Sequence, residues 1–486
     1  MPVRRPVCLA CLIFLFVVYI VTGGGAPAPS WDTMSAAQKT VTVCGRVADR
    51  QEKNGSCQLY LKDVSFISGS GSDRDQTYFP ERSNGIVVKL ADASHSAGNA
   101  KIGAIVEARG VFAPFEGSRC EGMFDAASYY MIRGYEGQLR RARLSAVSVR
   151  YDRISEGLRL VRDRAFHILR ENMSEEDAGL VAAMTLGDKS GIDTEIKELY
   201  QNAGISHVLA LSGLHIASVG LAIFAFVKKT GLPEKVASVV SLSLILTYAV
   251  MTGMSISTQR ALIMFGLFVM SRILGRTYDL LSAASVSALV ILAFDPCFVY
   301  DTGFLLSFGA VLGIACIFPV FERMAAFLPA GFTKGRIVKK IGQGVGVSLS
   351  ITAATLPVLG RSFMRISVCS VVINLVVIPL MGLVLLTGFA GIAVGFCGLD
   401  PGPIFTITHY ILWAFGTLGK FFEKIRGNIL TIGRPERWQI ITYGIIVITA
   451  VITSNIAPDI INLITRPNKS VDPTGLRYTN NTASYG

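Results

Sequence analysis

Residues 204–227 read GISHVLALSGLHIASVGLAIFAFV, the first of ten apolar runs that occupy the second half of the chain. A helix that crosses a membrane needs about 20 consecutive apolar residues. The later runs are 236–256, 261–274, 280–300, 303–321, 341–360, 366–384, 385–398, 404–421 and 438–457. Several are shorter than this, which is typical of broken or re-entrant helices inside a bundle. With a further run at 7–22, the pattern predicts a polytopic α-helical membrane protein.

The composition of the 486-residue chain agrees with this prediction. Apolar residues make up 51% of the sequence and charged residues 16%, whereas soluble domains carry about 25% charged residues. Too few charges remain to cover a soluble protein of this size. A soluble globular enzyme, a disordered chain and a fibrous protein are therefore excluded.

Residues 1–30 form a membrane anchor or a signal peptide. Arg4 and Arg5 precede the apolar run, and the small residues Ala26 and Ala28 are typical of a cleavage site. Prolines beside both alanines should hinder a peptidase, so we expect an uncleaved anchor. Either interpretation places residues 30 onward outside the cytoplasm.

Residues 31–150 are polar and predict a separate extracytoplasmic β domain. Short β-branched or alternating stretches read as strands between turn-forming clusters, at 40–47, 58–66, 85–90 and 104–112. About five strands in about 100 residues are typical of a small barrel, and we expect an OB-like (oligonucleotide-binding) barrel. The domain is close to neutral, with 11 basic and 12 acidic residues in 31–132, which makes it a poor general trap for polyanions.

An arginine-rich segment joins the β domain to the apolar runs. Residues 133–170 hold ten arginines against four acidic residues, and residues 151–203 read as an amphipathic helical connector. Two interpretations remain open: a helix that faces solvent or lipid headgroups, and a surface that contacts nucleic-acid phosphates. The candidate DNA contacts are Arg140, Arg141, Arg143 and Arg150.

Basic residues predict which loops of the membrane domain, residues 204–457, face the cytoplasm. They cluster after the second, sixth and tenth of the eleven runs, at 228–235, 323–340 and 420–437. If the chain crosses the membrane eleven times and its N-terminus lies in the cytoplasm, all three loops lie in the cytoplasm. The β domain and the polar tail at 458–486 then lie outside. This count depends on dividing residues 366–398 into two spans.

Two histidines lie in the first run of the membrane domain. If residues 204–219 form one helix, a single arc holds His207, Ser212, His215 and Ser218. Polar side chains inside a membrane are costly and usually face a bundle interior or an aqueous path. Interhelical packing and a path-lining surface both remain open. A metal site is not expected, because no convincing third ligand accompanies the histidines.

Two further positions interrupt the apolar runs. Arg260 lies at the edge of a run, where an ion pair or snorkelling is the favoured interpretation. The candidate acidic partners are Asp279, Asp295 and Asp301. Pro379 predicts a kink or break in a helix shortly after Asn374. Packing and pore-lining roles are equally compatible with this pair.

Cysteines and catalytic motifs add little. The β domain holds Cys44, Cys57 and Cys120, and Cys57 and Cys120 are the candidate disulfide in an oxidising compartment. The sequence contains no P-loop, zinc-protease or serine-hydrolase motif. No catalytic residue, metal or cofactor is therefore expected.

Four ordered segments resemble the ComEC family of competence proteins. They are SHVLALSGLHIA at 206–217, TGMSISTQRALIM at 252–264, DPCFVYDTGFLLSFGAV at 295–311 and LPVLGRSFMRISVCSVVINLVVIPL at 356–380. The resemblance covers roughly residues 40–400, including the OB-like module. The positions that match family motifs are candidate channel-lining residues: His207, Ser212, His215, Arg260, Asp301, Gly303, Ser307, Asn374 and Pro379.

The resemblance implies a channel of the bacterial inner membrane that takes up single-stranded DNA in natural transformation, and not an enzyme. Besides membrane lipid, it implies a competence DNA receptor and a cytosolic DNA-translocating ATPase as partners. Many family members end in a metallo-β-lactamase-like domain. We expect this chain to be a short form without that domain, so that a separate nuclease acts in trans. A homo-oligomer is compatible with the resemblance.

Two other functions remain open. A transporter or scaffold of the same fold for a non-DNA substrate would explain the near-neutral β domain. A membrane enzyme that uses His207 and His215 as acid and base is the third hypothesis, although no nucleophile or metal motif accompanies these histidines.

Overall fold

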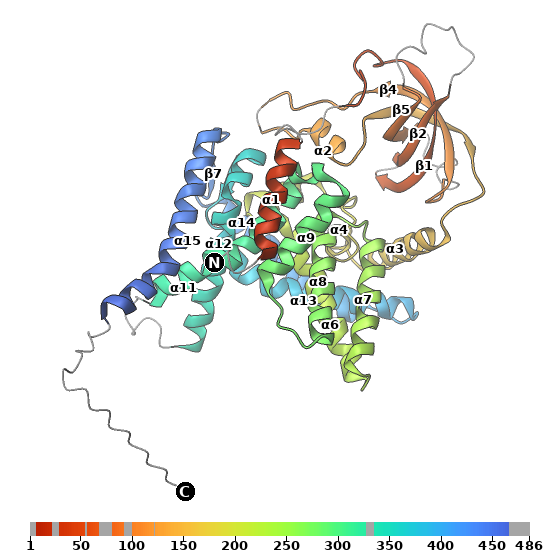
Figure 1. Ribbon diagram of the computed structural model, residues 1–486. Coiled ribbons are helices and arrows are strands. Elements are labelled where there is room, and N and C mark those ends of the chain that lie inside the picture. The colour runs from red at the N-terminus through yellow and green to blue at the C-terminus, as the bar shows by residue number, and fades with distance from the viewer. Residues whose placement is uncertain are drawn as a thin grey trace, which may run out of the picture.

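The N-terminal polar region forms a closed five-stranded barrel (Figure 1). A computed structural model of the chain describes residues 6–21, 29–53, 56–67, 80–91, 100–120, 122–326 and 335–465. The strands are β1 (Thr40–Lys53), β2 (Ser56–Ile67), β3 (Arg82–Leu90), β4 (Ile105–Ala113) and β5 (Gly137–Val147). Their order around the barrel is β1-β2-β3-β5-β4, with β3 and β5 parallel and the other neighbours antiparallel. The expected barrel is therefore confirmed.

Alternating side chains along the strands fill the barrel with apolar residues. Leu59, Phe112 and Leu139 are fully buried in this core. Gly137 is needed where β5 passes Phe112, because a Cβ at this position would lie 2.3 Å from the phenylalanine ring. β5 itself lies in the arginine-rich segment, which was not predicted to form a strand.

The expected disulfide between Cys57 and Cys120 is wrong. β2 directs Cys57 into the barrel core, where the side chain is fully buried. Cys120 is an exposed free thiol in the segment before α2 (Ala126–Ile132). A buried cysteine such as Cys57 serves as a small apolar core residue.

Three helices connect the barrel to the membrane domain: α3 (Arg153–Asn172), α4 (Glu175–Thr185) and α5 (Thr194–Asn202). The apolar face of α3 packs into the main helical core through Ala165, Ile168 and Leu169. α4 is buried from Asp177 to Thr185. The connector is therefore a packed part of the fold and not a helix lying freely on its surface.

The remaining helices follow in chain order. They are η4 (Ser206–Leu209), α6 (Gly213–Lys229), α7 (Glu234–Met251), α8 (Ile256–Ile273), α9 (Leu280–Phe294), η5 (Pro296–Tyr300), α10 (Thr302–Leu312), η6 (Gly313–Ile317), α11 (Phe318–Ala326), α12 (Arg336–Ser362), α13 (Ser370–Phe396), α14 (Gly402–Glu423) and α15 (Arg437–Thr465). The N-terminal run forms α1 (Pro6–Val21), which packs on α9. The candidate cleavage site at Ala26 and Ala28 lies outside the described residues.

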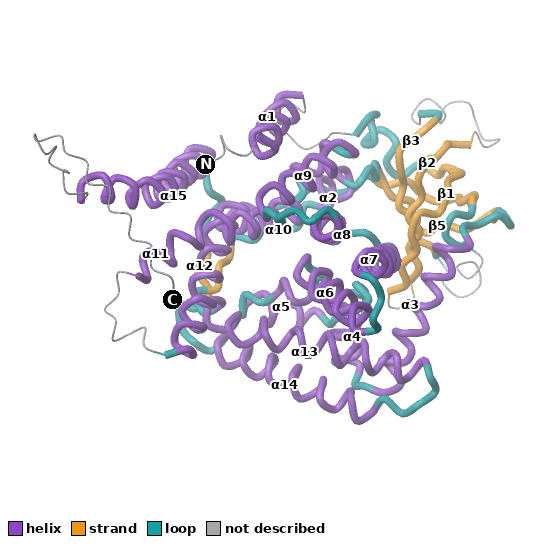
Figure 2. The backbone as a smooth tube through the Cα atoms, turned by 60° about the horizontal axis from the view of Figure 1, so that its bottom comes forward, coloured by secondary structure: helices purple, strands orange, loops and turns teal. Residues whose placement is uncertain are grey.

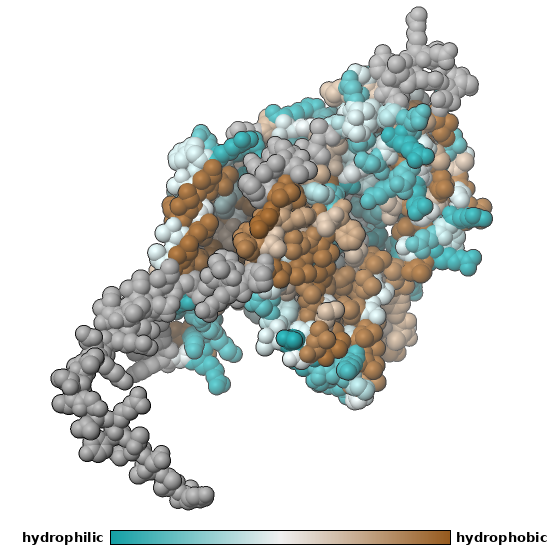
Figure 3. All heavy atoms as spheres, in the orientation of Figure 1, coloured by the Kyte–Doolittle hydropathy of each residue, from teal (hydrophilic) through white to brown (hydrophobic). Residues whose placement is uncertain are grey.

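Five helical stretches in the described part of the chain are long and apolar enough to cross a membrane. They are Glu234–Met251, Thr302–Ala325, Arg336–Ser362, Ser370–Phe396 and Arg437–Ser454. Apolar side chains gather on the surface of the helical part, whereas polar side chains cover much of the barrel (Figure 3). Val239 and Ile441, for example, are 59% and 62% exposed. Such a surface suits the hydrocarbon core of a bilayer.

The predicted division of residues 366–398 into two spans is wrong. α13 runs through this region as one helix of 27 residues, which is about 40 Å at 1.5 Å per residue. Pro379 lies exposed inside the helix and does not end it. α13 and α14 pack side by side and run across the direction of α7 in both views (Figures 1 and 2).

A small two-stranded sheet lies between one basic loop and the barrel domain. β6 (Arg365–Ser367), which follows α12, pairs with β7 (Ile429–Thr431), which follows α14. Met364, just before β6, lies beside Gly122 of the barrel domain. The strand that ends within the basic loop at 420–437 therefore lies close to the barrel domain, whereas the predicted topology separates this loop from the barrel by the membrane. α15 leads away from this end, and residues 466–486 of the tail lie outside the described residues.

Candidate functional site

The segment expected to form one helix over residues 204–219 changes conformation twice. η4 covers Ser206–Leu209, Ala210 has extended backbone angles, and α6 begins only at Gly213. The single polar arc predicted for a continuous helix is therefore wrong. The helix starts late because Ser212 acts as its N-cap and satisfies a backbone N–H that has no helical partner.

Ser212 and His215 form a reciprocal capping box at the start of α6. The His215 N–H donates to Ser212 Oγ at 3.4 Å, and the Ser212 N–H donates to His215 Nδ1 at 3.1 Å. Because Nδ1 accepts, the proton of the neutral ring lies on Nε2. Nε2 lies 2.8 Å from the sulfur of Met381 on α13. His215 is fully buried and therefore fixes the start of α6 against α13.

His207 has a different environment from His215. It lies on η4 and is exposed, as is its neighbour Ser206, while Ser212 is half-buried. The two imidazoles lie close enough to interact electrostatically. His207 is thus the histidine that a ligand can reach, next to the start of α6. Figure 2 shows α6 between α8 and α13.

Arg260 on α8 is buried against the start of α6, with 9% of its surface exposed. Its Nη2 would lie 2.1 Å from a Cβ placed on Gly213. Nη1 lies 3.8 Å from the sulfur of Met264, and the guanidinium carbon lies 5.7 Å from the centroid of the Phe308 ring. The Nε has no hydrogen-bond partner among the described residues.

The predicted ion pair between Arg260 and a nearby acid is wrong. Each of the three candidate carboxylates instead caps a helix. Asp279 accepts from Ser282 N–H at α9, Asp295 from Cys297 N–H at η5, and Asp301 from Phe304 N–H at α10. Aspartate directly before a helix favours this role. No ion pair in the described part of the chain includes Arg260.

Asp301 links the helical part to the barrel domain. Its Oδ2 forms an ion pair with Arg133 Nη2 at 2.8 Å, with side-chain exposures of 5% for Asp301 and 31% for Arg133. Arg133 follows α2 and lies over the ring of Tyr129. Gly303 is exposed beside Asp301 Oδ1, and Ser307 is half-buried further along α10. Asp301 and Gly303 therefore lie at the contact between the two domains.

Asn374 lies on α13, where its Oδ1 is buried without a hydrogen-bond partner among the described residues. Residues 204–215, around the start of α6, contact α13 both before and after Asn374 in the sequence of that helix. Gly204 lies against Ser370, and His215 lies against Met381. Asn374 therefore belongs to the stretch of α13 that the 204–215 segment covers.

The candidate DNA-contact arginines are exposed on the barrel side. Arg140, Arg141 and Arg143 lie on β5, and Arg150 lies in the loop before α3. Arg109, which pairs directly with Arg143 across β4 and β5, was not among the predicted contacts. Its outward position in the predicted strand 104–112 was the available signal. Two like charges in register are unfavourable, so this pair marks a locally basic surface on a near-neutral domain.

Two carboxylates between the barrel and α3 respond differently to burial. Burial raises the pKa of Asp49 on β1, although Arg162 on α3 opposes the shift. Burial also acts on Glu156, but hydrogen bonds from Arg159 and from the Ile102 N–H outweigh it and lower its pKa. These bonds are 2.7 Å and 3.0 Å long. Glu156 therefore ties α3 to the barrel as an ionised carboxylate.

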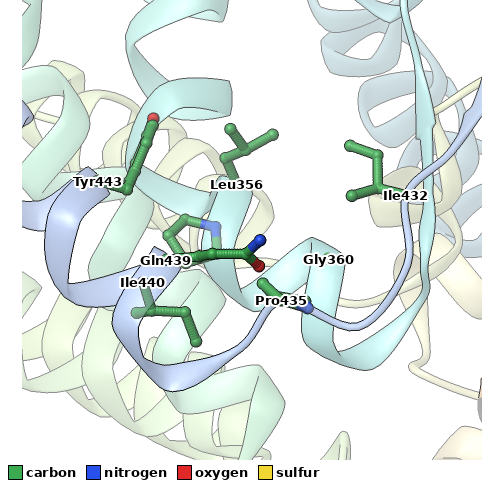
Figure 4. Close-up of a pocket in the computed structure, with 8 residues that line it drawn as sticks. Leu356, Gly360, Ile432, Pro435, Gln439, Ile440 and Tyr443 are labelled. Carbon is green, nitrogen blue, oxygen red and sulfur yellow. The ribbon is translucent and has the colours of Figure 1, made fainter.

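Neither a metal cluster nor a polar pocket adds to this site in the described part of the chain. No group of three His, Cys, Asp or Glu side chains among them is arranged for a metal ion. An apolar pocket lies between α12 and α15 (Figure 4), lined by Leu356, Pro357, Gly360, Ile432, Pro435, Gln439, Ile440 and Tyr443. Its lining comes from elements other than α6, α8 and α13, and it carries no ionisable group suited to catalysis.

Fold and site together define an α-helical membrane protein with an N-terminal β-barrel and a buried polar site at the start of α6. A family model described as Competence protein matches residues 184–455, which is more than half of the chain and includes every helix of this site. The chain therefore belongs to the Competence protein family, in agreement with the motifs that resemble ComEC proteins.

Relatives in curated collections share part of their length with this chain. The ComE operon protein 3 of Bacillus subtilis is 28% identical over 213 residues, or 44% of this chain and 26% of the relative. Competence protein ComA of Neisseria gonorrhoeae is 26% identical over 250 residues, or 48% of this chain and 34% of the relative. An uncharacterised protein of Aquifex aeolicus is 27% identical over 279 residues, or 57% of this chain and 62% of the relative. No solved structure matches the chain.

Proposed function

We propose that the protein is an inner-membrane channel that takes up single-stranded DNA in natural transformation. The observation that carries this proposal is the family match over residues 184–455, because it includes the whole polar site around α6. One relative is named a competence protein. In this function the protein moves its substrate without changing it chemically, and it needs no catalytic residue.

The proposed route begins at the barrel, which lies outside the cytoplasm. Exposed arginines such as Arg109 and Arg143 contact the phosphates of the incoming strand without reading its sequence. The strand then passes the start of α6, where His207, Ser212 and Asn374 supply polar groups. A DNA receptor, a cytosolic ATPase and a nuclease acting in trans would complete the uptake system.

Uptake of labelled DNA by the source bacterium tests this proposal. Nuclease-protected label in the cytoplasm is counted in the wild type, in a clean deletion strain and in the complemented strain. Deletion should abolish protected label, and complementation should restore it.

His207→Ala and Asn374→Ala should lower DNA uptake while the amount of protein in the membrane stays normal. His167→Ala is the matched control, because His167 is exposed on α3 and pairs with Glu171. Full uptake in the deletion strain would refute the proposal.

A transporter or scaffold for a non-DNA substrate is the second candidate. The observation that favours it is the near-neutral barrel, with 11 basic and 12 acidic residues in 31–132. A deletion strain with normal DNA uptake and an altered envelope or export profile would support this second function.

A further inference from the structure

The guanidinium group of Arg260 is a buried positive charge without a negative partner in the described part of the chain. Its neighbours include a thioether and an aromatic ring, and its Nε has no acceptor there. Tyr278 lies close enough to interact with it electrostatically. The three acids considered as its partners, Asp279, Asp295 and Asp301, are used as helix caps. A buried charge that lacks a partner is strongly unfavourable. Packing alone therefore does not account for an arginine at this position.

The N-terminus of α6 places a second positive feature at the same point. The first N–H groups of a helix have no helical acceptor, and the helix dipole adds partial positive charge there. Ser212 Oγ satisfies the N–H of His215, which leaves those of Gly213 and Leu214 without a helical acceptor. Arg260 Nη2 points to this end, since a Cβ on Gly213 would lie 2.1 Å from it. Two positive features thus converge at a point where no carboxylate among the described residues forms an ion pair with the arginine.

The site is open on one side. Leu214, the second residue of α6, is 48% exposed, and Ser206 and His207 on η4 are also exposed. The guanidinium itself remains nine-tenths buried. A ligand can therefore approach the N–H groups of the first turn from the exposed side and reach the arginine behind them.

We propose that Arg260 and the first turn of α6 bind one phosphodiester group of a single DNA strand. This inference rests on the proposed channel function and assigns it a specific contact. Helix N-termini bind phosphate oxygens through backbone N–H groups, and guanidinium groups bind them in a bidentate manner. Such contacts carry no sequence information, as passage of any strand requires.

A single phosphate site also suits transport. Conduction requires binding that is strong enough for entry and weak enough for release. One arginine and one helix end hold one phosphate at a time, so the strand can advance by exchanging one phosphate for the next. His207 at the open edge offers a polar surface during this exchange.

The test measures binding of a fluorescent oligodeoxythymidine to the purified full-length protein in phosphatidylcholine nanodiscs, over a series of salt concentrations. Arg260→Gln should weaken binding about tenfold and lower the salt dependence by about one counterion. Arg260→Lys keeps the charge and loses the bidentate geometry, so its affinity for the oligonucleotide should lie between those of the wild type and Arg260→Gln. Gly213→Ala, which displaces the guanidinium, should resemble Arg260→Gln.

Arg272→Gln is the matched control, because Arg272 lies on the same helix, is exposed and pairs with Glu234. Its affinity and salt dependence should equal those of the wild type. Unchanged binding in both Arg260→Gln and Gly213→Ala would overturn the inference. An effect of Arg260→Gln that is confined to nanodiscs containing phosphatidylglycerol would assign the site to a lipid headgroup and would also overturn it.

Thermal unfolding provides an independent measurement. If Arg260 is kept for a ligand, Arg260→Gln without DNA should melt no lower than the wild type, because it removes an unpaired buried charge. The oligonucleotide should raise the Tm of the wild type and not that of Arg260→Gln. A lower Tm for Arg260→Gln, with equal stabilisation of both proteins by DNA, would show a merely structural arginine.

Failure of this inference is distinguishable from failure of the proposed function. If deletion leaves DNA uptake intact while oligonucleotide binding still depends on Arg260, the phosphate site is supported and the channel function is refuted. If deletion abolishes uptake while Arg260→Gln binds and imports DNA like the wild type, the channel function is supported and the phosphate site at Arg260 is refuted.

Discussion

Two buried charges, Glu136 in the barrel and Arg260 in the helical part, have opposite environments. Glu136 is 6% exposed and accepts hydrogen bonds from Ser30 Oγ, Trp31 Nε1 and Ser83 Oγ at 2.7, 2.9 and 2.7 Å. Arg260 is 9% exposed, and its Nε has no partner in the described part of the chain. The barrel thus satisfies this buried charge internally, whereas the start of α6 leaves one unsatisfied. The first arrangement serves the fold, and the second is kept at a cost in stability.

The largest expected effect tests the barrel side of this comparison. Glu136→Ala leaves three donors without their carboxylate, and we expect a loss of about 3 kcal/mol in the free energy of unfolding. Pulse proteolysis of the full chain over a urea series measures it. Glu116→Ala, at an exposed glutamate, should change stability by less than about 0.5 kcal/mol. A small effect of Glu136→Ala would remove the contrast with Arg260.

Two glycines sharpen the comparison. A Cβ on Gly137 would clash with the rigid ring of Phe112, whereas a Cβ on Gly213 would clash with the end of the flexible Arg260 side chain. Gly137→Ala should therefore cost about 2 kcal/mol. Gly213→Ala should cost clearly less in the same urea assay, because the guanidinium can move. Gly117→Ala, where nothing lies within 4 Å of the new Cβ, is the control. Equal costs at Gly137 and Gly213 would mean that Arg260 is a locked core residue.

The boundary between the two regions gives a smaller effect. Arg133 and Asp301 form a partly exposed pair between the barrel domain and α10. A double-mutant cycle with Arg133→Gln and Asp301→Asn should give a coupling energy of about 1 kcal/mol that decreases as salt is added. Combining Asp301→Asn with Arg140→Gln should give no coupling. Additivity in the first cycle would show that the pair does not hold the two regions together.

The smallest effect concerns the dependence of stability on pH. The folded-state pKa of Glu156 lies below its ordinary value of 4.5, so the ionised group contributes stability above that value. The contribution is lost as the pH falls through the folded-state pKa. The Tm of the wild type should therefore decrease more steeply below about pH 4.5 than that of Glu156→Gln. Parallel curves would contradict the proposed bonds from α3 to the barrel.

The sequence predicted the barrel well because its signal is local. Alternating apolar residues and turn-forming clusters mark four strands. β5 was missed because charged residues at outward positions, such as Arg141 and Arg143, conceal the inward Leu139 and Ala142. The disulfide prediction was wrong because spacing does not reveal that β2 turns Cys57 inward.

The site was only partly predictable. Motifs pointed to His207, His215, Arg260 and Asn374, but their channel-lining roles remain predictions. The late start of α6 was missed because histidine replaces the usual glutamate or glutamine of a capping box. The environment of Arg260 could not be predicted, since it depends on long-range packing. The caps formed by Asp279, Asp295 and Asp301 could have been predicted, because each precedes a helix directly.

The π-helical turn η6 has a consequence for comparing sequences within the family. It accommodates one residue more than an α-helical turn would, and each α-helical residue corresponds to a rotation of about 100°. Deleting a single residue within Gly313–Ile317 should leave α10 and α11 as one continuous helix. The deletion should rotate α11 about the helix axis by about 100°. The face of α11 from which Arg323 donates to the Ser454 carbonyl on α15 would then point elsewhere. A one-residue gap at this position in an alignment would therefore mark a different helix contact and not a shorter loop.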